Sequence, residues 1–484
     1  MRIFLANAPW KKPGFYGVRA GSRWPHFEND FACYMPFPFF LAYATAILKD
    51  SGYEVLLVDA IAEDLDEAEF FSRLEDFRPD VIVYEVSTAS ILVDLNVAAR
   101  TREMFGGENK IVFAGAHKEM YESSFLQHEC NVDYVLIGEY EFSLLRLMEH
   151  LKEKMDLREV EGLIFRNAEG EVVQNQPRPL EQDLDKFPWP ARQFLPMHKY
   201  IDTPGGIPTP SLQLWASRGC PFKCIFCAWP QIMYGGAHYR TRRPKDVVDE
   251  LEWCIQEYGF KSFYFDDDTF NIGKPRILAL AHEIKERNIG LPWAIMARAD
   301  TMDREMLEAM REAGLYALKY GVESGSQELV SKACKGLNLQ KVRETIRITR
   351  ELGIKCHLTF MFGLPGETWE TVEETIHFAR EMDPDTLQFS IATPFPGSQF
   401  YQMMREQGHL MSDDFNEYDG YHRAVIRTEN LSARELEEAL RRANKMWYRH
   451  QFFRDFKSRK WEYFVDGLTH PVRAMKKARE VFGI

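Results

Sequence analysis

The stretch Ser217-Arg218-Gly219-Cys220-Pro221-Phe222-Lys223-Cys224-Ile225-Phe226-Cys227 decides how the rest of the chain is interpreted. Its three cysteines have the spacing C-x-x-x-C-x-x-C, so a single loop can place three thiolates around a small metal cluster. Iron–sulfur clusters are usually held by four protein ligands, and a set of three leaves one iron free for an exchangeable ligand. Two other interpretations remain open here: three buried structural cysteines, or a zinc loop that lacks its last ligand.

Composition sets the outer bounds of the interpretation. The chain has 484 residues, of which 45% are hydrophobic and 27% are charged, which indicates a globular protein of two or three domains. Its net charge of −13 argues against a nucleic-acid partner, because such surfaces cluster Lys and Arg against phosphates. Residues 1–9 are apolar too briefly for a signal peptide or a membrane span. The cysteines outside the loop show no spacing pattern that would indicate disulfides. We expect them to be reduced residues of the core in a cytoplasmic protein, namely Cys33, Cys130, Cys254, Cys334 and Cys356.

The first 151 residues alternate short apolar runs with helical stretches, which predicts an open α/β sheet. The expected strands are Ile3–Ala6, Glu54–Asp59, Val81–Tyr84, Lys110–Ala114 and Tyr134–Ile137. Ligands of such sheets bind outside the carboxyl ends of the strands. We therefore expect one crevice lined by Asp59, Ser87, Thr88, Gly115, Ala116, His117, Gly138 and Glu139. The glycines do not follow G-x-G-x-x-G, which argues against NAD or FAD.

Residues 152–210 are expected to connect two domains. Leu163–Arg166 and Val172–Gln174 flank a turn and predict a β-hairpin. Eight prolines follow between Pro177 and Pro210, and this composition favours an extended linker packed between the domains.

A second α/β unit is predicted over residues 211–398, with the cysteine loop at the end of its first strand. The expected strands are Ser211–Ala216, Lys261–Phe265, Trp293–Arg298, Ala317–Val322, Cys356–Met361 and Thr386–Ile391. Between them lie amphipathic helical stretches, namely Lys245–Tyr258, Pro275–Asn288, Asp303–Ala313, Leu339–Leu352 and Trp369–Glu381. Six such units make an incomplete parallel barrel, whose chemistry belongs at the carboxyl ends of the strands. These ends are polar or glycine-rich, as in Asp266–Thr269 and Glu323–Ser326.

The cysteine loop and these strand ends resemble the radical S-adenosylmethionine (radical SAM) superfamily. The resemblance implies that Cys220, Cys224 and Cys227 hold a [4Fe-4S] cluster whose open iron binds S-adenosyl-L-methionine (SAM). It also implies that Arg298, Glu323 and Ser324 surround the ribose and methionine ends of SAM. Phe226 and Trp229 are expected to flank the cluster and the adenine. A divalent-metal site at Asp266–Asp268 is a lesser alternative.

The N-terminal unit is similar to the cobalamin-binding domain of B12-dependent radical SAM enzymes. The similarity lies in Val86–Thr88, Gly115, Val135–Glu141 and Ala20–Pro25. It implies a Rossmann-like domain that binds cobalamin through Ser87, Thr88, Gly115, Gly138 and Glu139. The chain departs from the D-x-H-x-x-G pattern, because Asp59–Asp64 contains no histidine. We therefore expect methylcobalamin bound base-off without a histidine ligand; the alternative is a flavodoxin-like domain without a ligand.

Residues 399–484 are predicted to form a helical C-terminal region. Leu431–Tyr448 has strong helical spacing, and a stripe of aromatic and basic residues continues it to Phe456. We favour a helix packed across a barrel opening over contact with a membrane surface. The whole chain is thus expected to comprise a cobalamin domain (1–151), a linker (152–210), a partial (β/α)6 barrel (211–398) and this helical region (399–484).

The nearest resemblance is to hopanoid-biosynthesis radical SAM proteins and anaerobic porphyrin-ring cyclases, through Cys227–Gln231 and Phe265–Asn271. It implies a C-methyltransferase that abstracts hydrogen with a 5′-deoxyadenosyl radical and transfers methyl from methylcobalamin to a peptide, small molecule or lipid. A ring-forming, ring-contracting or oxidising enzyme is the alternative, and a non-catalytic B12 or redox sensor is the weakest one. Flavodoxin or ferredoxin is the expected electron donor. Asp267, Asn271 and His357 are expected beside the substrate, where they would handle a proton.

Overall fold

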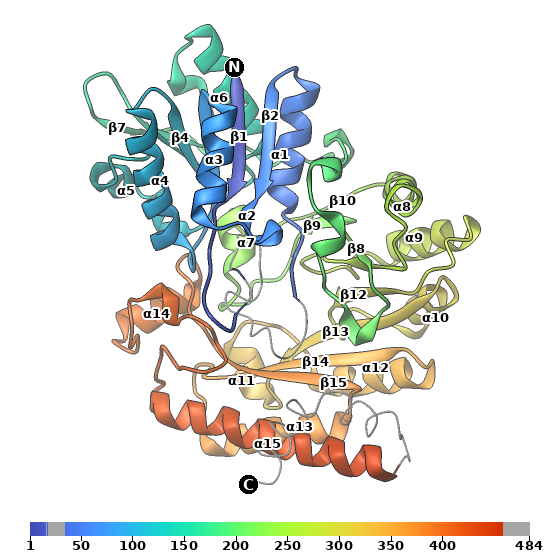
Figure 1. Cartoon of the computed structure of the whole chain (residues 1–484). Coiled ribbons are helices and arrows are strands. Elements are labelled where there is room, and N and C mark those ends of the chain that lie inside the picture. The colour runs from blue at the N-terminus through green and yellow to red at the C-terminus, as the bar shows by residue number, and fades with distance from the viewer. Residues whose placement is uncertain (16, 18–33, 458–484) are drawn as a thin grey trace.

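A computed structural model describes residues 1–15, 17 and 34–457 of the chain (Figure 1). The segment Ala20–Pro25, which contributes to the resemblance to cobalamin domains, lies outside the described residues. The described chain forms two sheets, one of seven strands and one of six, and a small two-stranded ribbon. The α/β class expected from the sequence is confirmed.

The first sheet has the strand order β2-β1-β3-β4-β5-β6-β7. Its strands are β1 (Arg2–Asn7), β2 (Glu54–Asp59), β3 (Val81–Ser87), β4 (Lys110–Ala116), β5 (Tyr134–Leu136), β6 (Leu163–Arg166) and β7 (Val172–Gln174). The helices of this unit are α1 (Phe39–Asp50), α2 (Ala60–Glu63), α3 (Glu67–Phe77), α4 (Ile91–Phe105), α5 (Ser123–His128) and α6 (Glu141–Glu153). Every residue of β3 is buried, as a central parallel strand requires.

The predicted hairpin is present as β6 and β7, but it belongs to the first sheet. β6 pairs antiparallel with β5, so the hairpin extends the sheet beyond the boundary expected at residue 151. A three-residue strand such as β5 needs a partner on its open edge, which the hairpin provides. Local apolar pattern predicts the hairpin itself, whereas the strand it pairs with depends on tertiary structure.

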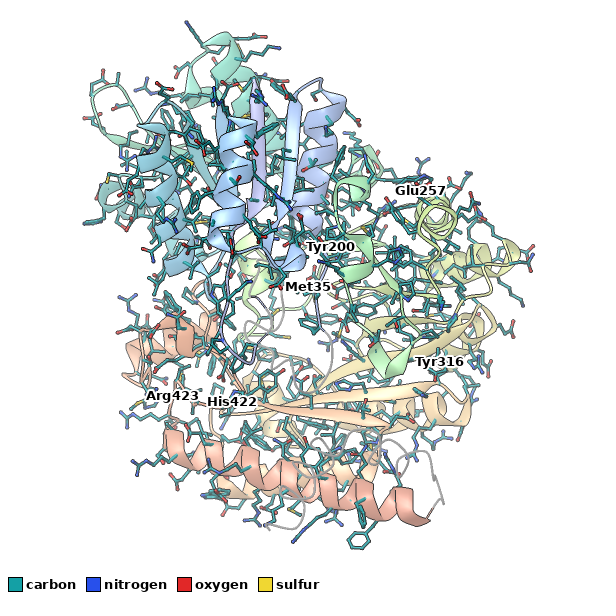
Figure 2. The ribbon with its side chains drawn as sticks, in the orientation of Figure 1. Met35, Tyr200, Glu257, Tyr316, His422 and Arg423 are labelled. Carbon is teal, nitrogen blue, oxygen red and sulfur yellow. The ribbon has the colours of Figure 1, made fainter. Side chains whose placement is uncertain are left out.

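The connection that follows packs along both units. The Ala191 N–H donates to Ala42 O at 3.0 Å on α1, and Met35 and Ile201 form an antiparallel bridge. Figure 2 labels Met35 and Tyr200 at this junction. Further on, Gly205 has a φ of +64°, and a Cβ placed there would collide with Ala317 Cβ inside the second sheet. The connection therefore closes the amino-terminal end of the barrel, and only glycine fits at that contact.

The second sheet has six parallel strands in the order β15-β14-β13-β12-β11-β8. They are β8 (Ser211–Leu214), β11 (Ser262–Phe265), β12 (Trp293–Ala297), β13 (Leu315–Glu323), β14 (Lys355–Phe362) and β15 (Thr386–Ile391). The helices of this part are α7 (Ala228–Met233), α8 (Pro244–Tyr258), α9 (Lys274–Glu286), α10 (Arg304–Glu312), α11 (Gln327–Lys332), α12 (Leu339–Glu351) and α13 (Trp369–Met382). β9 (Ser217–Gly219) and β10 (Tyr239–Thr241) form the separate ribbon around the cysteine loop.

The C-terminal part is helical, as expected, and contains α14 (Gln399–Glu406) and α15 (Ala433–Lys457). α15 packs against α13, β14 and β15 on the outside of the second sheet (Figure 1). It does not cross the barrel opening, which corrects the expectation. Its apolar face covers the outer side of the edge strand β15, which no further βα unit would cover. No helix among the described residues is both long and apolar enough to cross a membrane.

Both sheets share one hydrophobic core, which runs from Ile3 to Trp447. At the junction Phe39 from α1 stacks on Trp215, with ring centroids 4.1 Å apart and an interplanar angle of 10°. An aromatic pair of this kind stabilises by about 0.5–1.5 kcal/mol beyond its buried area. The two units therefore meet through packed side chains.

The cysteines outside the loop divide into two groups. Cys254 and Cys356 are buried, as expected. Cys130 and Cys334 are exposed, so for them the expectation of a core position was wrong; both lie in turns rather than on an apolar stripe. Cys33 lies outside the described residues.

Candidate functional site

A cavity of about 410 Å³ lies where the carboxyl ends of the strands of one sheet face those of the other sheet. The first unit contributes the ends of β3 and β4 and the start of α1. The second contributes the cysteine loop and the ends of β11 to β15. Its aromatic and large apolar lining residues are Phe37, Phe39, Phe40, Trp215, Phe226, Trp229, Ile232, Met296, Met361, Ile391 and Phe395. Because ligands of both fold types bind at the carboxyl ends of the strands, the cavity is the ligand side of both units at once.

The cysteine loop projects into this cavity. Cys220, Cys224 and Cys227 all line it. Gly219, just before the first cysteine, has a φ of +87°. A Cβ there would collide with the carbonyl oxygen of His238, the residue before β10. The loop is held further along by its Ile225 N–H, which donates to the Ala333 carbonyl at 3.1 Å. These contacts fix both ends of the loop while its thiols face the cavity.

The three thiols on one wall are soft donors of the kind that hold iron–sulfur clusters, and their burial makes the thiolate form costly without a metal. Burial raises the pKa of Cys227, and the neighbouring Cys224 and Cys220 raise it further. Burial also raises the pKa of Cys220, whose Sγ lies 3.1 Å from Thr269 Oγ1. Cationic iron offsets both the burial of thiolates and their mutual repulsion.

Within the described ranges, no group of three or more His, Cys, Asp or Glu side chains is arranged to hold one metal ion. In a cubane cluster each thiolate binds a different iron, so the three thiols need not converge on one point. The loop and its donors therefore fit a three-cysteine cluster.

Arg298 follows β12 and reaches the cavity wall. Asn271 fixes its backbone, because Asn271 Oδ1 accepts the Arg298 N–H at 2.8 Å. Asp300 accepts two hydrogen bonds from its guanidinium, at 3.0 and 2.8 Å. The guanidinium also lies 3.6 Å from the ring centroid of Phe222 in the cysteine loop. Arg298 is thus held rigidly next to the loop, with its charge already paired.

Glu323 and Lys335 form an ion pair in the same wall, with Lys335 Nζ 2.8 Å from Glu323 Oε1. Burial alone would lower the pKa of Lys335, but the carboxylate of Glu323 and the nearby Cys224 raise it, so the ammonium stays charged. Glu323 holds a backbone φ of +71° at a register shift of β13. Strained backbone of this kind clusters at functional sites.

Three further residues expected at the SAM site divide between lining and support. Phe226 and Trp229 line the cavity, and Trp229 lies 5.9 Å from Phe40 of the first unit, centroid to centroid. Ser324 is fully buried behind the wall, where its hydroxyl lies 3.1 Å from Thr375 Oγ1 and accepts the Ser326 N–H. Ser324 therefore shapes the turn after β13 and does not face the cavity.

On the first sheet, Ser87 and Thr88 line the cavity as expected. Thr88 Oγ1 lies 3.2 Å from His117 Nδ1, and burial lowers the pKa of His117 to about 4. His117 is therefore a neutral imidazole behind the wall. The hydroxyl of Ser87 lies 2.9 Å from Ser90 Oγ, which donates to Asp94 Oδ2 at 2.6 Å. Burial raises the pKa of Asp94 to about 8, so a protonated carboxyl supports this turn near neutral pH.

The three other residues expected to bind cobalamin have structural partners. Gly115 has a φ of +116°, and a Cβ there would collide with the backbone oxygen of Val86 on β3. A Cβ on Gly138 would lie 2.9 Å from the Met233 carbonyl at the end of α7. Glu139 forms buried ion pairs with Arg218 and Arg240 of the second unit. These positions serve close packing and the junction, and none of them lines the cavity.

The residues expected to handle a proton also lie outside the lining. Asp267 is fully buried and accepts hydrogen bonds from Ser217 Oγ and the Ala216 N–H, and burial raises its pKa to about 6. Asn271 is bound to Arg298 and Thr301. His357 lies near the amino-terminal end of β14, where its Nδ1 is 2.8 Å from Thr386 Oγ1. Asp267 and Asn271 therefore position neighbours, and His357 is at the opposite end of the strand from the cavity.

Several polar cavity residues were not singled out from the sequence. Among them are the charged residues Glu85, Lys335 and Asp419, whereas Asp266 and Asp268, which also line the cavity, belong to the segment considered from the sequence as a divalent-metal site. Asp266 and Asp268 flank Asp267, and the period of two along a strand predicts that these two face one side and Asp267 the other. The Tyr140 hydroxyl donates to Glu85 at 2.9 Å, and Asp419 accepts from the Tyr421 and His422 N–H groups. No local pattern marks Lys335, because its partner Glu323 is on another element.

Comparison with protein families bears out the two-part organisation. The model for the Radical SAM superfamily matches residues 216–379, and the model for the B12 binding domain matches residues 35–147. The first range contains the cysteine loop and Arg298, Glu323 and Lys335. The second contains the ends of β3 and β4 that line the cavity.

Curated relatives match most of the chain. An uncharacterized methyltransferase of Pyrococcus horikoshii is 29% identical over 412 residues, which cover 85% of this chain and 87% of that protein. The anaerobic magnesium-protoporphyrin IX monomethyl ester cyclase of Rubrivivax gelatinosus is 27% identical over 446 residues, covering 88% and 77%.

A solved structure shares the fold. It is the radical SAM methyltransferase TsrM from Kitasatospora setae, with cobalamin and a [4Fe-4S] cluster bound. Its TM-score is 0.63 at 20% identity, covering 84% of this chain and 75% of that chain. At this identity the likeness supports the arrangement of the two units.

Proposed function

Because the chain belongs to the radical SAM enzymes that also carry a B12-binding domain, we propose that it is a C-methyltransferase acting on an unactivated carbon. One observation carries the proposal: the cysteine loop and the β3 and β4 ends of the B12-binding domain line the same cavity. A substrate held there would lie between the cysteine loop and the β3 and β4 ends, and so beside both proposed cofactor sites. Among the relatives, the Pyrococcus protein is described as a methyltransferase.

The cofactors of the proposed reaction are a [4Fe-4S] cluster, SAM and cobalamin. When bound, the cluster and SAM supply a 5′-deoxyadenosyl radical that removes hydrogen, and cobalamin supplies the methyl group. Cys220, Cys224 and Cys227 are the proposed iron ligands. Glu323, Lys335 and Arg298 provide charged groups of both signs for the amino, carboxylate and ribose groups of SAM.

The protein also has to keep water away from a radical. Phe39, Phe40, Trp215 and Trp229 form an aromatic wall on the side where the units meet. Such a wall excludes water and holds the reacting groups at a fixed separation. Ser87 and Thr88 are the proposed polar contacts to cobalamin, whose binding base-off without a histidine ligand stays a prediction.

A second function is favoured by a specific relative. The Rubrivivax protein is a cyclase and matches 88% of this chain. A ring-forming, ring-contracting or oxidising reaction would use the same cavity without methyl transfer. A peptide, a small molecule or a lipid could each occupy this cavity, whose lining combines apolar and aromatic residues with several charged groups.

Product analysis separates the two functions. The reconstituted enzyme is incubated anaerobically with SAM carrying a deuterated methyl group, a one-electron reductant and fractionated cell extract. A methyltransferase forms S-adenosylhomocysteine and 5′-deoxyadenosine together, and a substrate in the extract gains the label. Sustained 5′-deoxyadenosine with S-adenosylhomocysteine at background would replace the methyl-transfer proposal by the second function. The variant with all three loop cysteines changed to Ala is the control, because without the cluster it should form neither 5′-deoxyadenosine nor the labelled product, both of which depend on the radical.

A further inference from the structure

Arg218 is a buried arginine that joins the cysteine loop to the first sheet. It lies two residues before Cys220 on β9, and its side chain is 3% exposed. Its Nη1 donates to Glu139 Oε1 at 3.1 Å and to Glu141 Oε1 at 2.7 Å. Both carboxylates follow β5 of the first sheet, at the start of α6. The guanidinium is therefore attached to the cluster loop at one end and to the B12-binding unit at the other.

A second arginine completes a neutral group of four charges. Arg240 on β10 pairs with Arg218 in the ribbon register and donates to Glu139 at 2.8 and 2.7 Å. Two guanidinium groups on adjacent strands repel each other unless carboxylates lie between them. Glu139 and Glu141 supply these carboxylates from the other unit. Because all four side chains are buried, the ribbon has its low-energy position only when it is docked on the first sheet.

The Arg218 guanidinium also lies among aromatic rings that reach the cavity. Its central carbon is 4.2 Å from the centroid of Phe187 and 4.6 Å from that of Tyr43. Phe40 and Trp215 complete the box at 5.3 and 5.1 Å, and both line the cavity. A shift of Arg218 would therefore move the aromatic wall between the two cofactor sides.

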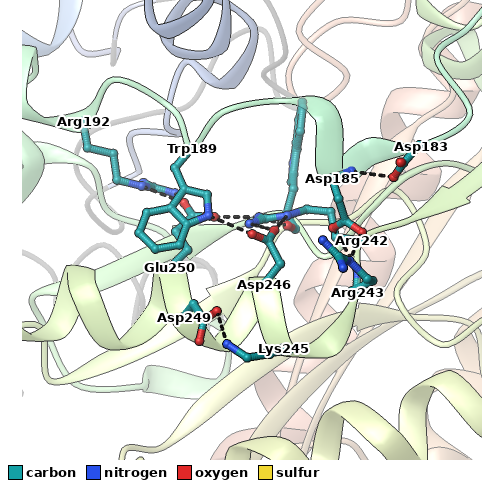
Figure 3. A network of polar contacts seen from close by, with 11 residues as sticks. Asp183, Asp185, Trp189, Arg192, Arg242, Arg243, Lys245, Asp246, Asp249 and Glu250 are labelled. Carbon is teal, nitrogen blue, oxygen red and sulfur yellow. Dashed lines mark hydrogen bonds and ion pairs between the residues drawn. The ribbon is translucent and has the colours of Figure 1, made fainter. Parts of the chain in front are cut away.

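The other end of the same ribbon is tied to its own unit. Arg242 donates to Glu250 and Asp246 of α8, and Glu250 also accepts from Arg192 (Figure 3). The ribbon thus has one anchor within the barrel unit and one on the B12-binding unit. Fixing the loop between these anchors fixes the relative position of both units.

We propose that Arg218 is a positioning residue that couples the two cofactors: when the cysteine loop is ordered around its cluster, Arg218 holds Glu139, Glu141 and Phe40 in place, and cobalamin then binds more tightly. The inference rests on the proposed function. Binding that orders a segment lowers the ordering cost for a second ligand that needs the same segment. The coupling is reciprocal, so cobalamin strengthens cluster retention by the same factor.

The test compares cobalamin affinity with and without the cluster. Hydroxocobalamin is titrated into full-length protein before and after anaerobic reconstitution with iron and sulfide, and binding is followed by its visible spectrum. The main variant is Arg218→Met with Glu141→Gln, which removes one positive and one negative charge and leaves Glu139 paired with Arg240. Arg102→Met is the matched control, because Arg102 pairs with Asp133 at the amino-terminal edge of the first sheet.

Wild type and Arg102→Met should bind hydroxocobalamin more tightly in the cluster-loaded form. In the double variant the ratio of the two affinities should fall to about one, although both forms still bind. An unchanged ratio in the double variant, or a wild-type ratio of one, would overturn the coupling. Glu141→Gln alone is the second variant if the double variant does not fold, and it should reduce the ratio. If the wild type binds neither iron nor hydroxocobalamin, the proposed function is overturned together with the coupling. Failure of the coupling alone is recognised because the wild type then still binds both.

Discussion

Lys335 Nζ donates a hydrogen bond to Glu323 Oε1 at 2.8 Å within the cavity wall, and the backbone of Glu323 is held in the left-handed region at a φ of +71°. A non-glycine residue in this region costs about 1–3 kcal/mol, and surrounding contacts must offset that cost. The ion pair is one of those contacts, and the Arg298 hydrogen bond to the Lys335 carbonyl at 2.9 Å is another. Glu323, Lys335 and Arg298 thus form one rigid charged group beside the cysteine loop.

Lys335→Met should weaken SAM binding by at least about tenfold, which corresponds to about 1.4 kcal/mol. The substitution removes the ammonium and leaves the carboxylate of Glu323 buried without its partner, which also destabilises the fold by about 3–5 kcal/mol. Equilibrium dialysis with labelled SAM on reconstituted protein measures the first effect. The double variant Lys335→Met with Glu323→Gln should regain most of the stability but not the affinity. Full SAM affinity in that double variant would remove both residues from the proposed SAM site.

Changing Cys220, Cys224 and Cys227 to Ala should reduce iron from about four atoms per chain to background after anaerobic reconstitution. The three thiols are the proposed ligands because they share one loop and one cavity wall. Iron and acid-labile sulfide are quantified together. Cys334→Ala is the control, because Cys334 is an exposed cysteine outside the loop and its loss should leave the iron content unchanged. Retention of about four irons in the triple variant would contradict the assignment.

Cob(II)alamin bound to the protein should show no superhyperfine splitting from a strongly bound nitrogen. Asp59–Asp64 contains no histidine, and the imidazole of His117 is turned to Thr88 behind the cavity wall. Electron paramagnetic resonance of the reduced cobalamin complex measures the axial ligand directly. His117→Ala should give the same spectrum as wild type. A nitrogen splitting that disappears in His117→Ala would identify that histidine as the ligand.

The free energy of unfolding of the first unit should decrease as the pH rises from about 4 to about 8, because Asp94 keeps its proton in the folded state over this range. Burial raises the pKa of Asp94 in the folded protein to about 8, far above its ordinary value. In that window the folded state keeps a proton that the unfolded state has lost, so each pH unit costs up to about 1.4 kcal/mol. Asp94→Asn should flatten the pH dependence of the thermal midpoint. Asp76→Asn on the exposed face of α3 is the control and should leave the slope as in wild type.

The sheets themselves could be predicted from sequence because their strands are buried apolar runs between turn residues. The structure has a strand at every predicted position. One of them, β15, begins and ends at the predicted residues, Thr386 and Ile391. The cysteine loop could be predicted because its three ligands are close together in sequence. The opposite orientation of Asp267 and its neighbours Asp266 and Asp268 could also have been predicted, since side chains alternate between the two sides of an extended segment. His357 could likewise have been placed at the start of its strand from the position of the apolar run.

The contacts between units could not be predicted in this way. Glu139 carries a carboxylate at a strand end, which is also what a ligand site requires, and its partner Arg218 is 79 residues away in sequence. Lys335 lies in a turn whose local pattern is ordinary, and only the fold brings it to Glu323. A charged residue at a strand end is therefore ambiguous until the opposing surface is known.

The cavity takes its lining from residues as far apart as Phe37 and Gly420. During synthesis the B12-binding unit emerges first, and the cysteine loop emerges before β14, β15 and the segment after them have been made. An unfinished chain therefore contains the proposed cofactor contacts before the cavity wall is complete. Because of this sequence separation, the proposed reactive centre becomes enclosed only after the chain has been made as far as Gly420.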